Sequence, residues 1–145
     1  MSQSFSLDPR LAADCHRFGQ LGDAELLLMN NAHFPWLILV PHSSQTELHE
    51  LELSQQQALL TSINLLSDFI KQHFSSDKLN IATIGNIVSQ LHIHIIGRRH
   101  DDLCWPGVVW GTSHKTPYID SDVQQINTAL IKHLGNSFIA SSDQA

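Results

Sequence analysis

The sequence has few of the features that stabilise small secreted proteins. Only Cys15 and Cys104 are present among 145 residues, which is too few for a disulfide framework. The N-terminal stretch MSQSFSLDPR lacks the basic and apolar regions of a signal peptide. We therefore expect the protein to occupy a reduced, cytoplasmic environment.

Long apolar runs and positive charge are also scarce. The longest apolar run is 36–40 (WLILV), whereas a helix that spans a bilayer needs about 20 apolar residues. Eight Lys and Arg stand against fourteen Asp and Glu, which gives a formal net charge of −6. A chain with this charge is not attracted as a whole to nucleic acid or to an anionic membrane. We expect no nucleic acid or membrane partner, and any phosphate site must be local.

The chain does have enough apolar residues for one core. Hydrophobic residues make up 42% of it, so a core can form without help from disulfides. No repeat, linker or low-complexity segment divides the sequence. We predict a single domain over residues 1–135, followed by a partly disordered tail over residues 136–145.

Two capping-box patterns predict the longer helices. The first begins at Ser54 and precedes apolar residues at intervals of three and four as far as Phe74. The second begins at Ser121 and opens a C-terminal helix that Gly135 would end. The apolar stripe of the long helix needs a sheet or another helix to cover it.

A short opening helix and four strands complete the prediction. Asp8 followed by Pro9 is typical of a helix start, and apolar residues at helical spacing continue to Gly19. Short apolar segments bounded by Gly, Pro and Asn indicate strands. The predicted strands are 25–29 and 36–40, which would form an antiparallel pair, and 79–84 and 90–96. The chain therefore reads as an α+β protein.

Residues 90–96 (QLHIHII) alternate strictly between polar and aliphatic side chains. In an extended strand, a side-chain period of two places Gln90, His92 and His94 on one face. The other face is aliphatic and can pack on the long helix. Its members are Leu91, Ile93 and Ile95.

Two imidazoles on one strand face have three interpretations, of which the first two need no phosphate. The face can be an exposed, half-polar surface of the sheet. It can also present two nitrogens to Zn²⁺ or Fe²⁺, but such a pair needs a third ligand. Arg98, directly after the strand, would repel a cation. We therefore expect no metal.

The third interpretation is phosphoryl or nucleotidyl chemistry. A neutral imidazole is a good nucleophile toward phosphorus, and a second imidazole or an arginine can stabilise charge on the other oxygens. Arg98 and Arg99 are unfavourable beside two imidazoles unless an anion lies between them. Asn86 and Ser89 add donors that can reach such an anion.

The same stretch resembles the signature of the histidine triad (HIT) family of nucleotide hydrolases and transferases. That signature is His-φ-His-φ-His-φ-φ, in which φ is apolar. In this register His92 is the central histidine, His94 is the last, and Gln90 replaces the first.

The resemblance extends over about residues 9–118. Residues 29–41 are similar to the segment of the family that holds the nucleoside, and Trp105-Pro106-Gly107 is similar to the Trp-Pro that closes the site in some branches. Within the family, the chain looks most like bacterial diadenosine tetraphosphate hydrolase-like members with a Gln-Leu-His-x-His version of the triad. The fold implied is an antiparallel sheet of about five strands with one long helix packed on it and a C-terminal helix. The resemblance also implies a homodimer and a reaction that requires no cofactor.

The resemblance also assigns roles to individual residues. His92 would attack the α-phosphorus of a nucleotide and form a nucleotidyl-histidine, while His94 would donate to a phosphate oxygen. Asn86 would contact the phosphate, and Asn30 the ribose hydroxyls. The remaining residues expected in the nucleotide site are Ser89, Arg98 and Trp105.

Gln90 leaves two functions open. Its amide can hold a neighbouring group but cannot transfer a proton. If the first triad position is structural, the protein is a hydrolase of dinucleoside polyphosphates such as diadenosine tetraphosphate, or of nucleoside phosphoramidates. If that position shuttles a proton, the protein is a purine-nucleotide-binding protein with little turnover.

Overall fold

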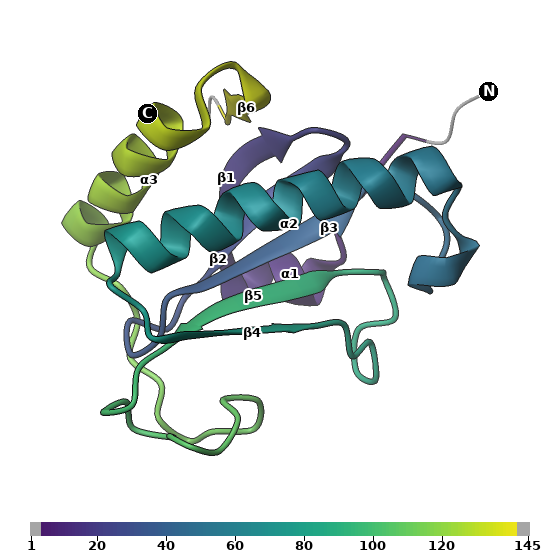
Figure 1. Cartoon of the computed structure of the whole chain (residues 1–145). Coiled ribbons are helices and arrows are strands. Elements are labelled where there is room, and N and C mark those ends of the chain that lie inside the picture. Colours follow the sequence, from purple (N-terminus) through teal and green to yellow (C-terminus); the bar gives the residue numbers. More distant parts are fainter. Residues whose placement is uncertain (1–3, 142–145) are drawn as a thin grey trace.

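The structure is a computed structural model that describes residues 4–141. Six antiparallel strands form one sheet in the order β4-β5-β3-β2-β1-β6 (Figure 1). The strands are β1 (Cys15–Leu21), β2 (Ala24–Met29), β3 (Trp36–Pro41), β4 (Lys78–Ala82), β5 (Ile93–Arg98) and β6 (Phe138–Ala140). The helices are α1 (Pro9–Asp14), α2 (Leu53–His73) and α3 (Asp120–Leu134), with short 3-10 turns η1 (Leu48–Glu50) and η2 (Gly135–Ser137).

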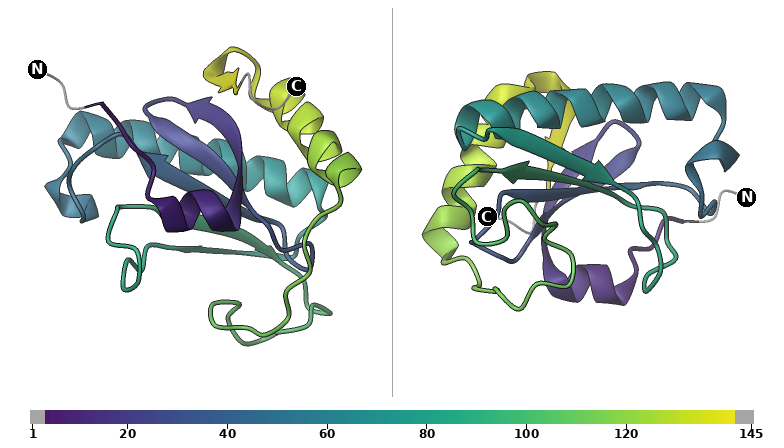
Figure 2. Two further views of the ribbon diagram at one scale, coloured as in Figure 1. Left: turned by 180° about the vertical axis from the view of Figure 1, so that it is seen from behind. Right: turned by 60° about the horizontal axis from the view of Figure 1, so that its bottom comes forward.

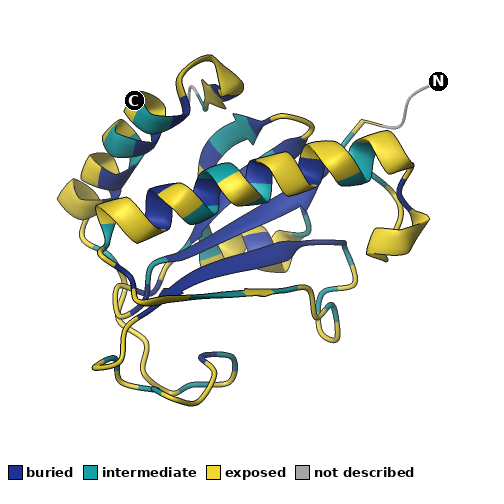
Figure 3. Ribbon diagram, viewed as in Figure 1, coloured by how far each residue is buried: buried dark blue, intermediate teal, exposed yellow. Residues whose placement is uncertain are grey.

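This arrangement confirms the predicted α+β fold and adds one strand to the sheet. β2 and β3 form the antiparallel pair that the sequence indicated, and β3 also pairs with β5. β3 and β5 are therefore interior strands, and every residue in them is buried (Figure 3). The middle of the sheet lies between two apolar layers.

One apolar layer lies between the sheet and α2, which runs across one face of it (Figure 1). Ile93 and Ile95 of β5 belong to this layer together with Leu66 and Ile70 of α2, and none of the four is more than 2% exposed. Burial of these side chains holds α2 on the sheet. The prediction that the aliphatic residues of 90–96 face the long helix is confirmed.

The second apolar layer lies on the opposite face, where α1 packs (Figure 2). Leu11 of α1 is 4% exposed and belongs to one cluster with Phe34, Trp36 of β3 and Ile96 of β5. Trp36 and Ile96 are opposite each other in the antiparallel register. The polar alternates of β5 therefore face a second buried layer rather than solvent.

The capping of the two long helices differs from the prediction. Glu52 and Gln55 form the capping box of α2, so the helix begins before the predicted cap at Ser54. α3 begins at Asp120 without a side-chain cap, whereas Gly135, with a φ of 55°, ends it as predicted. Because Glu52 takes the N-cap position, Ser54 lies inside the first turn of the helix and does not cap it. No helix within residues 4–141 combines the length and apolar character needed to cross a membrane.

The opening helix is shorter than predicted. Asp8 caps it by accepting from the main-chain amide of Arg10, but α1 ends at Asp14 and does not reach Gly19. The following residues form β1, which pairs with both β2 and β6. A bulge between Arg17 and Gly19 interrupts the alternation of β1, so the usual signal for a strand is lost there.

The segment predicted as a tail contains the sixth strand. Residues 138–140 form β6 and pair with residues 19–21 of β1. Phe138 is 8% exposed and belongs to the apolar layer beneath α2 and α3. Residues 142–145 of the predicted tail lie outside the described residues.

Gly97 lets the segment after α2 approach β5 closely, and we expect Gly97→Ala to be destabilising. An added Cβ would lie 2.6 Å from Cγ2 of Ile70, 3.1 Å from Cγ of Pro35, and closer still to Oγ of Ser76. β5 is paired on both sides and cannot easily move away. The expected loss in the free energy of unfolding is about 1–3 kcal/mol, measured by urea denaturation.

Ser76→Ala provides the matched control for Gly97→Ala. The Ser76 hydroxyl is buried and has no hydrogen-bond partner among the described residues, so its removal alone should change stability little. In the double variant it should recover part of the loss. A Gly97→Ala protein as stable as the wild type would contradict this account of the packing.

Candidate active site

β5 brings the two predicted histidines to the face of the sheet opposite α2. His94 lies in β5 and His92 immediately precedes the strand, and they are 6% and 5% exposed. Their neighbours Ile93 and Ile95 belong to the layer beneath α2. The imidazoles therefore project toward the side on which α1 packs (Figure 2).

A main-chain carbonyl fixes the tautomer of His92. Nδ1 of His92 lies 2.7 Å from the carbonyl oxygen of Gln90. Because a carbonyl oxygen can only accept, Nδ1 must carry the proton and donate it. The neutral ring then has its lone pair on Nε2, which leaves that nitrogen able to act as a nucleophile or base.

His94 is held in the opposite tautomer. The indole Nε1 of Trp36 donates to Nδ1 of His94 over 2.9 Å. Because an indole N–H only donates, the proton of the neutral His94 ring lies on Nε2. Burial lowers the pKa of His94 to about 4, and the neighbouring His92 contributes a smaller effect. At pH 7, His94 is a neutral ring with an Nε2–H donor.

The two rings form a complementary pair. Their centroids are 4.9 Å apart, and the ring planes are inclined at 69°. One ring offers a lone pair and the other an N–H group. Such a pair can attack an electrophilic centre and at the same time donate to an oxygen bound to that centre.

A cavity of about 240 Å³ lies beside His94. Residues from the end of α1, the end of β2, β3 and the loop before α3 line it, including Asp14, Asn30, Trp36, Trp110 and Lys115. Aromatic rings in such a site can contact the faces or edges of a planar ligand. The amide and charged groups supply polar contacts around it.

The lowered pKa of His94 predicts a loss of stability in mild acid. The unfolded chain gains a proton at this residue near its ordinary pKa of 6.5, whereas the folded protein gains it only near pH 4. Stability is therefore complete above pH 6.5 and decreases as the pH falls toward 4. The expected contribution of His94 over this window is about 3 kcal/mol.

His94→Gln separates this effect from the other histidines, because its side-chain oxygen can still accept from the Trp36 indole. Urea denaturation at pH 7 and pH 4.5 measures the difference in unfolding free energy for both proteins. The variant should lose less stability than the wild type over this interval. An equal loss in the two proteins would show that His94 is not responsible.

The comparisons with known proteins show which family has this fold. The model of the HIT domain family matches residues 10–101 of the chain. The chain belongs to the HIT domain family. A histidine triad protein from Bradyrhizobium japonicum has 39% identity to this HIT protein and a TM-score of 0.87, and the match covers 90% of this chain and 98% of the other.

Two further solved HIT structures show the same degree of similarity. A histidine triad (HIT) protein from Sinorhizobium meliloti has 38% identity and a TM-score of 0.87, over 90% of this chain and 98% of its own. A histidine triad protein from Marinobacter aquaeolei has 42% identity and a TM-score of 0.86, over 90% and 96% of the two chains. None of the curated proteins matches the chain significantly.

Gln90, which the resemblance to the signature places at the first triad position, binds the N-terminal segment with its side chain. Its Nε2 donates to the carbonyl oxygen of Ser6 over 2.8 Å, and its Oε1 accepts from the main-chain amide of Asp8 over 2.8 Å. Within the described residues, Gln90 is hydrogen-bonded to His92 through its main-chain carbonyl and not through its side chain. The amide of Gln90 is thus used to hold the chain rather than a ligand.

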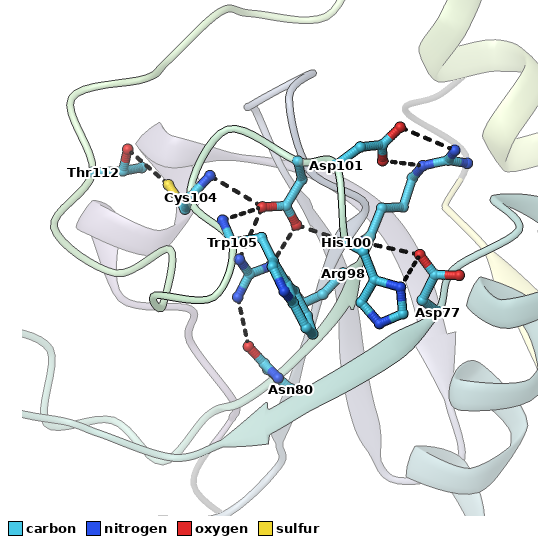
Figure 4. Close-up of polar contacts among 10 residues, drawn as sticks. Asp77, Asn80, Arg98, His100, Asp101, Cys104, Trp105 and Thr112 are labelled. Carbon is cyan, nitrogen blue, oxygen red and sulfur yellow. Dashed lines mark hydrogen bonds and ion pairs between the residues drawn. The ribbon is translucent and has the colours of Figure 1, made fainter.

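Arg98 is the most deeply enclosed charged residue of the predicted site, at 1% exposed. Its Nε and Nη2 donate to the two carboxylate oxygens of Asp102 over 2.8 and 2.9 Å, and its Nη1 donates to Oδ1 of Asn80 over 2.8 Å. The ring of Trp105 lies beside the guanidinium, with 5.6 Å from Cζ to the ring centroid (Figure 4). Arg98 and Trp105 therefore contact other residues of the chain and anchor the loop that follows β5.

The other predicted nucleotide-binding residues lie in three separate parts of the structure. Asn30 lines the cavity, and its Oδ1 accepts from the main-chain amide of Tyr118 over 2.9 Å. Asn86 is exposed in the loop between β4 and β5. Ser89 lines a separate hollow of about 340 Å³ between the N-terminal segment and residues 43–46. The structure therefore brings His94 and Asn30 to one cavity, and not Ser89.

Sequence reasoning missed the contributions of Trp36 and Trp110. The ring of Trp110 is 5.5 Å from that of His94 and 6.2 Å from that of Trp36, between centroids. Its buried indole N–H has no hydrogen-bond partner in the described part of the chain. The signal for Trp36 appears only with the strand register, which pairs Ile38 with His94 and so places Trp36 on the same face.

Proposed function

We propose that this HIT protein is a nucleotide hydrolase that attacks the α-phosphate of a dinucleoside polyphosphate, with diadenosine tetraphosphate as the model substrate. The observation that carries the proposal is the pair of opposite tautomers at His92 and His94. A nucleophilic nitrogen and a neutral N–H donor side by side are what displacement at a phosphate requires. No cofactor is needed for either role.

The proposed reaction has two steps. The lone pair on Nε2 of His92 attacks the α-phosphorus, and the bond from phosphorus to the bridging oxygen breaks, so that its electron pair leaves with the polyphosphate. Nε2–H of His94 donates to a non-bridging oxygen as charge develops there. Water then attacks the nucleotidyl-histidine, the N–P bond breaks, its electron pair returns to Nε2, and the proton that water loses passes to solvent. Diadenosine tetraphosphate gives AMP and ATP.

The amide of Gln90 favours a polyphosphate over an amine as the leaving group. An amide has no proton to transfer at neutral pH. A polyphosphate leaves as a stable anion, whereas the amine of a phosphoramidate must be protonated as it leaves. We therefore place phosphoramidates second among the substrates of the proposed hydrolase.

The cavity beside His94 is the proposed nucleoside site. Asn30 lines it and supplies an amide for the ribose hydroxyls, and Trp110 supplies an aromatic ring and an N–H that has no partner among the described residues. A nucleoside in this cavity would bring its α-phosphate toward His94. Purine preference remains part of the proposal.

A purine-nucleotide-binding protein with little turnover is the second candidate. The observation that favours it is that the side-chain amide of Gln90 is already hydrogen-bonded to the backbone of Ser6 and Asp8. In this case the two histidines would bind the phosphate without completing the reaction. Affinity for AMP would then exceed any measurable rate of cleavage.

Product analysis separates these candidates. The protein, treated with a chelator, is incubated with diadenosine tetraphosphate, and the nucleotides are resolved by anion-exchange chromatography. The proposal expects equal amounts of AMP and ATP. Binding of AMP by calorimetry without any products would favour the binding protein. Activity that returned only with zinc would contradict the metal-free mechanism. Residues 4–141 contain no group of three His, Cys, Asp or Glu that could hold a metal ion.

The proposal also includes a cytoplasmic homodimer without a nucleic acid or membrane partner. β4 is an edge strand of the sheet, and its Ile81 is 48% exposed. An exposed edge of this kind is suited to pairing with the same strand of a second copy. The net charge of −6 supports the absence of a polyanionic partner.

A further inference from the structure

The side chain of Gln90 binds the N-terminal segment in the manner of a neighbouring strand. It accepts from the amide of Asp8 and donates to the carbonyl of Ser6, which are the two groups on either side of Leu7. In a parallel ladder, one residue uses its own N–H and C=O to bond in the same way to the residues before and after its neighbour. The amide of glutamine can reproduce this pattern because its donor and acceptor project from the same end. The two nitrogens of an imidazole diverge and cannot.

Other contacts hold the same segment in place. We define residues 4–8 as the N-terminal strap. Leu7 is 8% exposed and belongs to the apolar layer that contains α1. The ring of Phe5 lies 4.2 Å from that of His42, between centroids. Just beyond the strap, Arg10 donates to the carbonyl of Ile87 over 2.7 Å. The strap is therefore packed against the apolar layer and His42, and the start of α1 is tied to the loop that leads to β5.

The strap reaches the proposed nucleophile through a single residue. Gln90 binds the strap with its side chain and accepts from Nδ1 of His92 with its main-chain carbonyl. A movement of the strap would therefore displace the carbonyl that fixes the tautomer of His92.

We propose that Gln90 is a positioning residue whose side-chain amide holds the N-terminal strap and thereby keeps His92 in the tautomer with its lone pair on Nε2. This inference rests on the proposed function of His92. The inference gives a physical role to the glutamine that stands in place of the first histidine. Gln90 links the nucleophile to the N-terminal strap. In this account, the strap helps to keep His92 in its reactive tautomer before substrate binds.

Gln90→Met tests the proposal, since methionine has a similar length but neither donor nor acceptor. Long-range ¹⁵N spectra of the histidine rings report the tautomer of His92 without requiring turnover. The wild type is expected to show Nδ1–H alone, and Gln90→Met a mixture of tautomers. If the protein hydrolyses diadenosine tetraphosphate, kcat should fall by about 10-fold to 100-fold with little change in KM, because the loss is one of alignment.

Two further variants complete the test. Gln72→Met removes an exposed glutamine on α2 that hydrogen-bonds Asp68, and it should leave both the spectrum and kcat unchanged. Leu7→Ala weakens the packing of the strap but retains Gln90, and it should shift the His92 tautomer in the same direction as Gln90→Met. This variant also decides the matter if Gln90→Met does not fold.

The outcomes separate this inference from the proposed function. A wild-type tautomer in both folded Gln90→Met and Leu7→Ala would overturn the positioning role, whatever the activity. A mixture of tautomers in the variants of a protein that has no hydrolytic activity would support the link between strap and His92, while the proposed function would fail. A fall in kcat with an unchanged tautomer would also contradict the inference.

Discussion

Replacing His92 with asparagine is expected to lower kcat for AMP release from diadenosine tetraphosphate by at least about 10³-fold, because it removes the nitrogen lone pair that attacks phosphorus. His92 is buried beside His94 and has its Nδ1 fixed by the carbonyl of Gln90. The lone pair on Nε2 is therefore the one that reaches the phosphate in the proposed mechanism. Initial rates at saturating substrate measure the effect.

A second histidine variant controls for a general effect of the substitution. His100→Asn changes an exposed residue whose side chain is 70% accessible and contacts Asp77. It should retain the wild-type kcat. A His92→Asn protein that is folded, as judged by circular dichroism, and that retains a tenth or more of the wild-type kcat would contradict the nucleophilic role.

Asp102→Ala is expected to reduce the free energy of unfolding by about 3–5 kcal/mol, because it leaves the charge of the buried Arg98 without its partner. The side chains of Arg98 and Asp102 are 1% and 8% exposed, and two hydrogen bonds join them. Burial would raise the pKa of Asp102, but hydrogen bonds from Arg98 and from main-chain amides lower it to about 2. The pair is thus ionised at pH 7, where urea denaturation measures the loss.

The neighbouring residue provides a matched control for Asp102→Ala. Asp101 pairs with Arg99, but these side chains are 73% and 50% exposed. Solvent screens an exposed pair, so Asp101→Ala should change stability little. In Figure 4, Arg98 lies between Asn80 and Trp105, whereas the side chain of Asp101 points away from them. Equal losses for the two alanine variants would show that burial does not determine the strength of these pairs.

Regular alternation made β5 predictable, and an irregularity concealed β1. Residues 90–96 alternate without a break, so the sequence already separates the residues that face α2 from the two histidines. In β1 the bulge between Arg17 and Gly19 shifts the pairing register. Apolar residues on either side of a bulge lose the period of two, and here they imitate the spacing of a helix. The predicted opening helix was therefore too long.

The sequence identified the histidines of the site but not the groups that control them. The partner of His94 is Trp36, which lies 58 positions earlier, and the partners of Gln90 lie 82 and 84 positions earlier. No local pattern connects residues so far apart, because the strand register and the path of the N-terminal segment bring them together. The same limit applies to Arg98. Its four-residue separation from Asp102 can be read from the sequence, but its burial cannot.

The most direct test of the central claim is the detection of a nucleotidyl group on His92. The protein is mixed with diadenosine tetraphosphate, quenched under conditions that preserve an N–P bond, and analysed by intact mass and peptide mapping. The proposed mechanism predicts an added AMP group on the peptide that contains His92, which His92→Asn abolishes. Release of AMP by the wild type with no adduct at any time of quenching, or an adduct on another residue, would contradict it.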